Sequence, residues 1–238
     1  VLETPIDNIS VYGVDTDISP YDSGSYASST TYLTGMAAVK ACEQLREHII
    51  ALAAARMNKD ASALTFDGEN VIDESDGSKM SLFDIATASM CNNEISMEVT
   101  YSHSSPVSPP PFMAACAEVE VDPETGAIEL LDYTACVDCG TVVNTNLARV
   151  QTEGGLLQGI GMTLYEDIWY DERGKNLSNS FMQYKVPSRL DTDRIRVEFD
   201  SSYEPTGPFG AKSIGEIVIN TPAPAIADAV YNLSLIHI

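Results

Sequence analysis

Basic residues are scarce in this sequence of 238 residues, which has 13 lysines and arginines against 35 aspartates and glutamates and a formal net charge of −22. A chain this acidic repels the phosphate backbone of nucleic acids. It also repels the anionic surface of the inner membrane leaflet. We therefore expect neither nucleic acid nor a membrane surface as a partner.

Long apolar runs are absent as well, since no stretch approaches the roughly 18 consecutive apolar residues that a membrane span needs. We see no signal peptide. The five cysteines are an odd number in apolar contexts, which indicates free thiols in a reducing compartment and a cytoplasmic location.

A zinc site or redox role for the pair Cys136 and Cys139 in "CVDC" is weakly supported, because a second pair and a nearby histidine are lacking. It stays an alternative. A [2Fe–2S] cysteine pattern is also missing, so such a cluster would have to sit on another polypeptide or segment.

An initial methionine is lacking too, and the chain starts as though within a domain. The last six residues, "LSLIHI", resemble a translated adapter used in sequencing-library preparation. We expect residues 1–232 to be the C-terminal part of a longer domain, truncated at both ends, and residues 233–238 to be a cloning or assembly scar.

The hydrophobic pattern predicts an α+β fold, because strands and helices are mixed without a regular βαβ rhythm. The clearest feature is a hairpin over 112–137 around the turn "DPETG". The other expected strands and small hairpin cover 9–14, 63–81, 94–102, 165–170 and 194–200. Helices are expected up to about residue 57 with Ser28 or Ser29 as N-cap, after Ser81, over 145–165 with Asn144 or Thr145 as N-cap, and from Pro222.

The helix predicted over 145–165 contains four glycines, Gly154, Gly155, Gly159 and Gly161. Each costs about 1 kcal/mol relative to alanine inside a helix. Tight packing of a neighbouring helix and a bulky ligand explain them equally well. Gln151 and Gln158 are seven residues apart and share a face, so they could present two amides to one ligand.

The serine-rich stretch "SGSYASSTT", residues 23–31, precedes a predicted helix. Free backbone amides and the helix dipole at such a start favour an anion such as phosphate. The alternative is a simple capping loop, and the motif is no P-loop because no G-K-[ST] follows.

The loop "GAKSIGE", residues 210–216, places Glu216 directly after a glycine. An arbitrary glutamate in such a loop is usually a solvated turn residue. However, this loop, the serine-rich stretch and the glycine-rich helix could together surround one phosphate-bearing cofactor.

These motifs, in this order, resemble the molybdopterin-binding subunit of the xanthine dehydrogenase and aldehyde oxidase family, the molybdenum hydroxylases. The resemblance extends from about Ile9 to Asn232 and rests on "DTDISPYDSGSYASSTTYLTG", "EVEVDPETGAIELLDYTACVDCGTVVN", "ARVQTEGGLLQGIG", "YKVPSRLD" and "GPFGAKSIGE". It implies the family's α+β cofactor-binding domain, with mixed sheets and long packed helices.

The resemblance also implies roles for individual residues. Glu216 would be the general base, taking a proton from a hydroxyl on molybdenum while a hydride passes from the substrate to the sulfido ligand. Gln151 would hydrogen-bond near the metal ligands. The remaining cofactor contacts would come from Tyr26, Ala27, Ser28, Ser29 and Thr30, and from Lys212, Ser213, Ile214 and Gly215.

The implied enzyme is a molybdenum-dependent oxidoreductase that hydroxylates an electron-poor carbon of a purine-like N-heterocycle or an aldehyde. Its implied partners are iron–sulfur (2Fe-2S) and flavin (FAD) subunits or domains, in an oligomer. Some members have Gly and Arg in the serine-rich loop, where this chain has Ala27–Ser29. This difference leaves open whether the cofactor is plain molybdopterin or its cytosine dinucleotide form. The rival hypothesis is a non-catalytic scaffold or assembly module with the same fold.

Overall fold

The structure, a computed structural model, describes residues 1–238 except 14, 92–94, 189, 192–193 and 235–238. The chain divides into two compact units, Val1–Gly24 with Leu33–Ser105, and Ser25–Tyr32 with Pro106–Ile238. Each has its own hydrophobic core. Within the described residues, no helix is both long and apolar enough to span a bilayer.

The first unit packs two helices with a small antiparallel sheet. Helix α1 is Gly35–Met57, the strands are β1 (Leu64–Phe66), β2 (Asn70–Asp73) and β3 (Lys79–Ser81), and helix α2 is Leu82–Cys91. Ile49 and Leu52 of α1 are buried in its core with Phe66 and Ile85. Ser81 accepts a hydrogen bond from the amide of Asp84, as expected for the N-terminal cap of α2.

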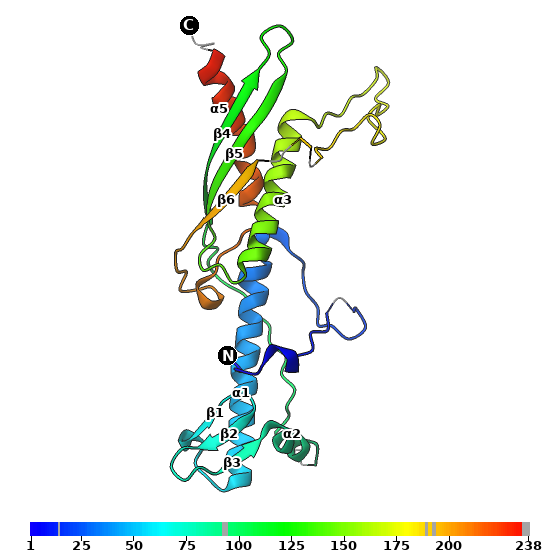
Figure 1. Cartoon of the computed structure of the whole chain (residues 1–238). Coiled ribbons are helices and arrows are strands. Elements are labelled where there is room, and N and C mark those ends of the chain that lie inside the picture. The colour runs from blue at the N-terminus through cyan, green and yellow to red at the C-terminus, as the bar shows by residue number, and fades with distance from the viewer. Residues whose placement is uncertain (14, 92–94, 189, 192–193, 235–238) are drawn as a thin grey trace. The chain divides into compact units, whose positions relative to one another are not determined.

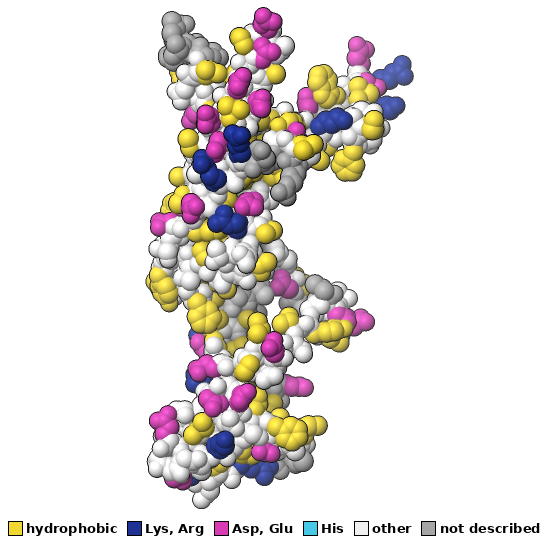
Figure 2. Space-filling model, viewed as in Figure 1, with side chains coloured by type: hydrophobic (Ala, Val, Ile, Leu, Met, Phe, Trp, Pro, Cys, Tyr) yellow, Lys and Arg dark blue, Asp and Glu magenta, His cyan; other side chains and the backbone are white. Residues whose placement is uncertain are grey.

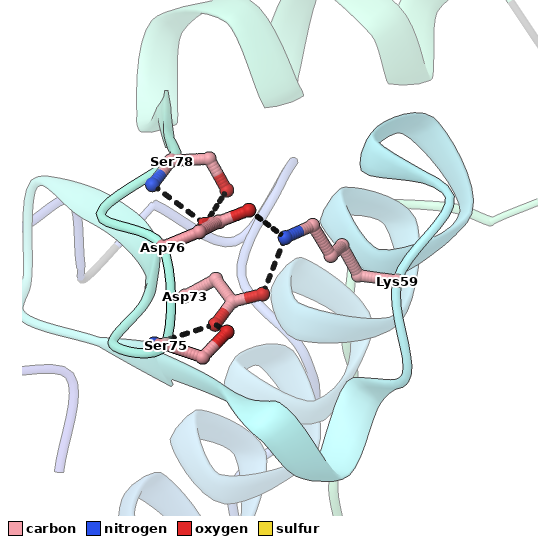
Figure 3. A network of polar contacts seen from close by, with 5 residues as sticks. All are labelled: Lys59, Asp73, Ser75, Asp76 and Ser78. Atoms are coloured by element: carbon pink, nitrogen blue, oxygen red, sulfur yellow. Dashed lines mark hydrogen bonds and ion pairs between the residues drawn. The ribbon is translucent and has the colours of Figure 1, made fainter.

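A polar cluster closes the turn between β2 and β3 (Figure 3). Lys59 pairs with Asp73, with 2.6 Å between Nζ and Oδ2, and also with Asp76. Ser75 and Ser78 donate hydrogen bonds to these two carboxylates. Hydrogen bonds from Lys59 lower the pKa of Asp73 and of Asp76, and the same contacts raise the pKa of Lys59.

The second unit is built on a three-stranded sheet of order β4-β5-β6 (Figure 1). Strand β4 (Phe112–Val121) is antiparallel to β5 (Ile128–Asp138), and β6 (Ile195–Asp200) is parallel to β5. The parallel pair requires a crossover, and helix α3 (Thr145–Leu164) lies within that crossover. The short helix α4 (Ile217–Asn220) packs on α3, while α5 (Pro222–Ser234) packs on β4 and α3.

The core of the second unit lies between the sheet and these helices. Tyr133 and Val197 of the sheet are buried with Leu156, Ile160 and Ile226 of the helices. Burial raises the pKa of Tyr133, whose hydroxyl donates a hydrogen bond to Thr221 over 3.0 Å.

The residues of the long hairpin alternate between the core and solvent. Glu118, Glu120 and Glu129 are exposed, whereas Val119 and Leu130 pack against the core. Acidic side chains accordingly gather over the hairpin in the space-filling view (Figure 2). The alternation leaves one apolar face of the hairpin to pack against α5 and α3.

Three of the expected strands are wrong. Residues 9–13, 95–102 and 165–169 form no strand, while Val14 and Glu94 lie outside the described residues, and Tyr170 makes only an isolated bridge with Asn176. Apolar and β-branched composition favoured strands there, but a strand needs a pairing partner.

The expected serine N-cap of the first long helix is also wrong. A π-helical turn, Thr30–Thr34, precedes α1, and no side chain caps its start. The helix ends at Met57 as predicted, and Asn144 caps α3 by accepting a hydrogen bond from the Leu147 amide. At the chain end, Leu233 and Ser234 continue α5, and residues 235–238 lie outside the described part.

Candidate functional site

A pocket of about 580 Å³ lies within the second unit. Three chain segments far apart in sequence line it, together with the start of α3. The lining residues are Ser25, Ser28, Thr30, Thr31, Cys139, Thr141, Val142, Val143, Asn144, Leu147, Ala148, Gln151, Ala211, Lys212, Ile214, Gly215 and Glu216.

The parallel pairing of β5 and β6 explains why two of these segments meet. Asp138 and Asp200, the last residues of the two strands, are partners in the sheet register. The chain that follows β5 enters the pocket at once, and the chain that follows β6 reaches it at Ala211. Ligand sites in α/β sheets commonly lie beyond the carboxyl ends of parallel strands.

Backbone hydrogen bonds join these two segments at the base of the pocket. The Lys212 amide donates to the Cys139 carbonyl over 2.7 Å, and the Thr141 amide donates to the Gly210 carbonyl over 2.8 Å. Gly140 has a φ of +70°, and a Cβ there would lie 2.3 Å from the Gly210 carbonyl oxygen. Only glycine therefore allows this close approach.

The serine-rich loop reaches the pocket through a strained turn. Ala27 and Ser28 have φ values of 49° and 59°, a left-handed conformation that is costly for residues with a Cβ. The Ser28 hydroxyl accepts a hydrogen bond from the Glu216 amide over 2.6 Å. A Cβ on Gly215 would lie 2.7 Å from the same hydroxyl, so this glycine lets the two loops touch.

Glu216 is exposed and lines two adjoining pockets. In the first it shares the lining with Gln151. In the second, of about 370 Å³, it lies with Gln151, Gly154 and Gln158. Among the described residues, no side chain pairs with or donates to the Glu216 carboxylate, which is therefore open to a ligand in either pocket.

The glycines of α3 serve two purposes. A Cβ on Gly155 would lie 2.1 Å from Val218 Cγ2, and one on Gly159 would lie 2.6 Å from Pro222 Cγ, so these residues let α4 and α5 pack closely. A Cβ on Gly161 would instead meet the Glu166 and Pro187 side chains of the chain that follows α3. Gly154 has nothing within 4 Å and lines the second pocket. Helix packing therefore accounts for two of the four glycines, and packing of the following chain segment accounts for Gly161.

The Lys212 ammonium group pairs with Asp138 and is therefore not available to a ligand. The side chain is buried, and Nζ lies 2.8 Å from Asp138 Oδ2 and 5.4 Å from the centre of the Phe112 ring. Burial alone would raise the pKa of Asp138, but hydrogen bonds from Lys212, Ser202 and the Gly140 amide outweigh it and lower that pKa. The cation is neutralised by this carboxylate beside the pocket.

The structure brings together seven of the eleven predicted site residues in the first pocket. These are Ser28, Thr30, Gln151, Lys212, Ile214, Gly215 and Glu216. Tyr26, Ala27, Ser29 and Ser213 do not line it, and the Tyr26 side chain is 63% exposed. Within the left-handed turn at Ala27 and Ser28, it is Ser28 that contacts Gly215 and Glu216.

Sequence reasoning missed the segment that follows β5. Thr141, Val142, Val143 and Asn144 line the pocket, as do Leu147 and Ala148 in the first turn of α3. The available signal was a glycine two residues after the end of a strand, followed by an asparagine N-cap directly before a helix. Such a short strand-to-helix turn often borders a ligand site.

The cysteine pair forms no metal centre in the described part of the chain. Cys136 is exposed in β5 and Cys139 is buried just beyond its end, both as free thiols. Among the described residues, no group of three or more His, Cys, Asp or Glu side chains could hold a metal ion. Burial raises the pKa of Cys139, so its thiol stays protonated at neutral pH.

Comparison with known proteins decides the family. The family model described as the molybdopterin cofactor-binding domain matches residues 1–193. The chain belongs to this family. The predicted resemblance to the molybdenum-cofactor-binding subunits of xanthine dehydrogenases and aldehyde oxidases is thereby confirmed, as is the α+β fold class.

Several relatives of this molybdopterin cofactor-binding domain are named as oxidoreductases. It is 37% identical to the "Probable hypoxanthine oxidase XdhD" of Escherichia coli (strain K12), over 98% of the chain and 24% of that protein. It is 30% identical to the "6-hydroxypseudooxynicotine dehydrogenase complex subunit gamma" of Paenarthrobacter nicotinovorans, over 96% of the chain and 30% of that protein. The chain thus spans less than a third of either relative.

A solved structure shares the fold. The crystal structure of the Cu,Mo-CO dehydrogenase superposes with a TM-score of 0.83 at 26% identity, covering 97% of this chain and 30% of that chain. Its high coverage extends over both units of the molybdopterin cofactor-binding domain.

Proposed function

We propose that this chain forms part of a molybdenum hydroxylase in which Glu216 is the general base. The reaction would be the oxidative hydroxylation of an electron-poor carbon in a purine-like N-heterocycle or an aldehyde. The observation that carries the proposal is the position of Glu216, whose amide is held by Ser28 and whose side chain lines a pocket with Gln151.

The residues of the first pocket suit an organic, oxygen- and nitrogen-rich cofactor. Hydroxyls come from Ser25, Ser28, Thr30, Thr31 and Thr141, and amides come from Asn144 and Gln151. These groups both donate and accept hydrogen bonds, as a pterin and its phosphate require. The volume of about 580 Å³ lies within the range of small-molecule sites.

Molybdopterin, plain or as the cytosine dinucleotide, would lie against the serine-rich loop and the start of α3. The helix start favours a phosphate through its free amides and dipole. Ser28 and Thr30 would face the cofactor from one side, and Ile214 and Gly215 from the other. Lys212 would hold the Ile214–Gly215 side in place through its backbone hydrogen bond to Cys139 and its ion pair with Asp138. Four further residues would contribute by shaping the loops that contact the cofactor, namely Tyr26, Ala27, Ser29 and Ser213.

The bound molybdenum centre would supply the two-electron oxidation of the substrate carbon. The chain's own part is to orient and to move a proton. The Glu216 carboxylate would accept a proton from the attacking hydroxyl, and Gln151 would donate or accept a hydrogen bond beside it. A bound cofactor and substrate would shield this carboxylate from water and bring its proton affinity closer to neutral pH.

Electrons would leave through 2Fe-2S and FAD centres on partner subunits or other segments, in an oligomeric enzyme. One observation supports a multi-component enzyme, namely that a relative at 30% identity is named as a subunit of a dehydrogenase complex.

The test is Glu216→Gln in the full protein that carries this chain, assayed with a panel of N-heterocycles and aldehydes that includes hypoxanthine. We expect kcat to fall roughly 100- to 10,000-fold with the molybdenum content unchanged, because a general base contributes about that much. Glu198→Gln is the matched control, since Glu198 is an exposed glutamate of β6 outside both pockets. Turnover of Glu216→Gln close to that of the control would remove Glu216 from the base role.

A further inference from the structure

The buried ion pair between Asp138 and Lys212 has no direct place in the proposed reaction. Lys212 is 8% exposed, and its cation is neutralised before it can reach a ligand. Burying an ion pair costs desolvation free energy, and apolar residues of similar size usually stabilise a protein as well or better. Its presence beside the pocket therefore calls for an explanation other than stability.

The Asp138 carboxylate is fully engaged. Oδ2 accepts a hydrogen bond from Lys212 Nζ over 2.8 Å. Oδ1 accepts from the Gly140 amide over 2.9 Å and from the Ser202 hydroxyl over 2.6 Å. The Asp138 side chain therefore links three places in the chain: the turn after β5 at Gly140, the segment after β6 at Ser202, and the Ala211–Glu216 segment at Lys212.

The backbone contacts start from the same two residues. Asp138 ends β5, and the next residue, Cys139, accepts the hydrogen bond from the Lys212 amide. Gly140 and Ala211 form an isolated antiparallel bridge. Beyond this bridge the two segments line the pocket separately, one as Thr141–Asn144 and the other as Ile214–Glu216.

Glu216 lies four residues beyond Lys212. The segment between them is held at Lys212 by the ion pair and at Glu216 by the hydrogen bond from the Glu216 amide to the Ser28 hydroxyl. The contact of Ser28 with the Glu216 amide requires Gly215 to lie against the serine side chain with little tolerance. A shift of the Lys212 backbone would be carried along this short segment to Glu216.

We infer that Asp138 and Lys212 are a positioning pair, which holds the turn after β5 and the Ile214–Glu216 segment in register so that the Glu216 carboxylate is placed in the pocket. The inference rests on the proposed function for its catalytic consequence, but the register itself is a property of this chain.

The decisive variant is the double substitution Asp138→Leu with Lys212→Met, which replaces the pair by apolar side chains. The double variant is expected to have a higher Tm than either single variant, because each single substitution leaves a buried charge unpaired. Amide hydrogen exchange is then measured at Gly140, Thr141, Lys212 and Glu216 in the protein without substrate. We expect exchange there to be roughly 10- to 100-fold faster than in the wild type, because hydrogen bonds to charged groups are lost.

The matched control is Lys59→Met in the first unit, which removes another lysine paired with aspartate. Exchange at the four pocket amides should not change in this variant. Exchange at Tyr133 and Val137, within β5, should be unaffected by the double variant and reports that the sheet is intact.

A kinetic measurement on the full protein completes the test. The double variant should lower kcat roughly 10- to 100-fold, as expected for a misplaced catalytic group, while KM changes less. Wild-type exchange at the pocket amides would overturn the inference, and so would faster exchange with an unchanged kcat. The proposed function has its own separate failure, namely unimpaired turnover in Glu216→Gln, which leaves the exchange result standing.

Discussion

Helix α1 of the first unit contains glycine only at its first residue, Gly35, whereas helix α3 of the second unit contains four glycines. In α1, Ile49, Leu52 and Ala53 fill the core with side chains. In α3, glycines bring α4 and α5 close to the helix backbone instead. Each such glycine costs about 1 kcal/mol of helix stability. The glycines lower the helix propensity of α3, but they allow the Gly215–Ile219 segment to pack against the face of α3 that carries Gln151.

Left-handed backbone at residues with a Cβ occurs in both units. In the second unit, Ala27, Ser28 and Phe209 have positive φ values and lie in the loops that form the pocket. In the first unit, Glu3 has a φ of 59°, and Asn58 adopts the left-handed conformation at the end of α1, an ordinary helix C-terminus. Strain at Ala27 and Ser28 has no such local reason, which is the pattern expected where structure serves a site.

The largest expected effect tests whether the two cores are separate. Leu52→Ala in the first core and Leu156→Ala in the second each remove a buried side chain and should cost about 2–5 kcal/mol. Amide hydrogen exchange should accelerate mainly in the unit that carries the substitution. Equal acceleration in both units for either variant would show that they unfold as one body and would break the comparison.

The adjacent glycines of α3 allow a sharper test. Gly155→Ala places a Cβ against Val218 and should lower the free energy of unfolding by about 1–3 kcal/mol. Gly154→Ala meets open space and should raise that free energy by up to about 1 kcal/mol through helix propensity. Urea unfolding measures both. The same sign for the two variants would contradict the assignment of Gly155 to helix packing.

Removing single hydroxyls should reveal the difference in burial. Tyr133→Phe removes a buried hydrogen bond to Thr221 and should cost about 1 kcal/mol. Tyr12→Phe in the first unit removes an exposed contact with Asp15 and should change stability by less than about 0.5 kcal/mol. Chemical denaturation of the two variants compares them, and equal costs would argue against burial as the cause.

The effect expected for Lys59→Met depends on pH. Contact with Lys59 lowers the pKa values of Asp73 and Asp76 in the folded state, so the contribution to stability is present above their unfolded pKa of about 4 and is lost as pH falls below it. The stability difference from wild type should therefore be larger at pH 6 than at pH 3. Thermal unfolding at the two pH values measures it, and a larger difference at pH 3 would contradict the role of the pair.

The sequence by itself determined the local elements and the family. The turn "DPETG" within 112–137, the asparagine before Thr145 and the apolar spacing of α1 are local patterns. Each predicted its element because it reflects backbone geometry and burial over a few residues. The order of motifs identified a molybdopterin cofactor-binding domain and picked out Glu216, Ser28 and Gln151 as candidates.

Only the tertiary structure decided which segments share the pocket. The parallel pairing of β5 with β6 brings the Thr141–Asn144 turn to the loop that carries Glu216, and no local signal encodes that pairing. The same holds for the Ser28 contact with Glu216, which joins residues 188 positions apart, and for the pairing of Lys212 with Asp138. Strand composition failed at 9–13 and 95–102 for the same physical reason, since a strand is stabilised by a partner that its own residues do not specify.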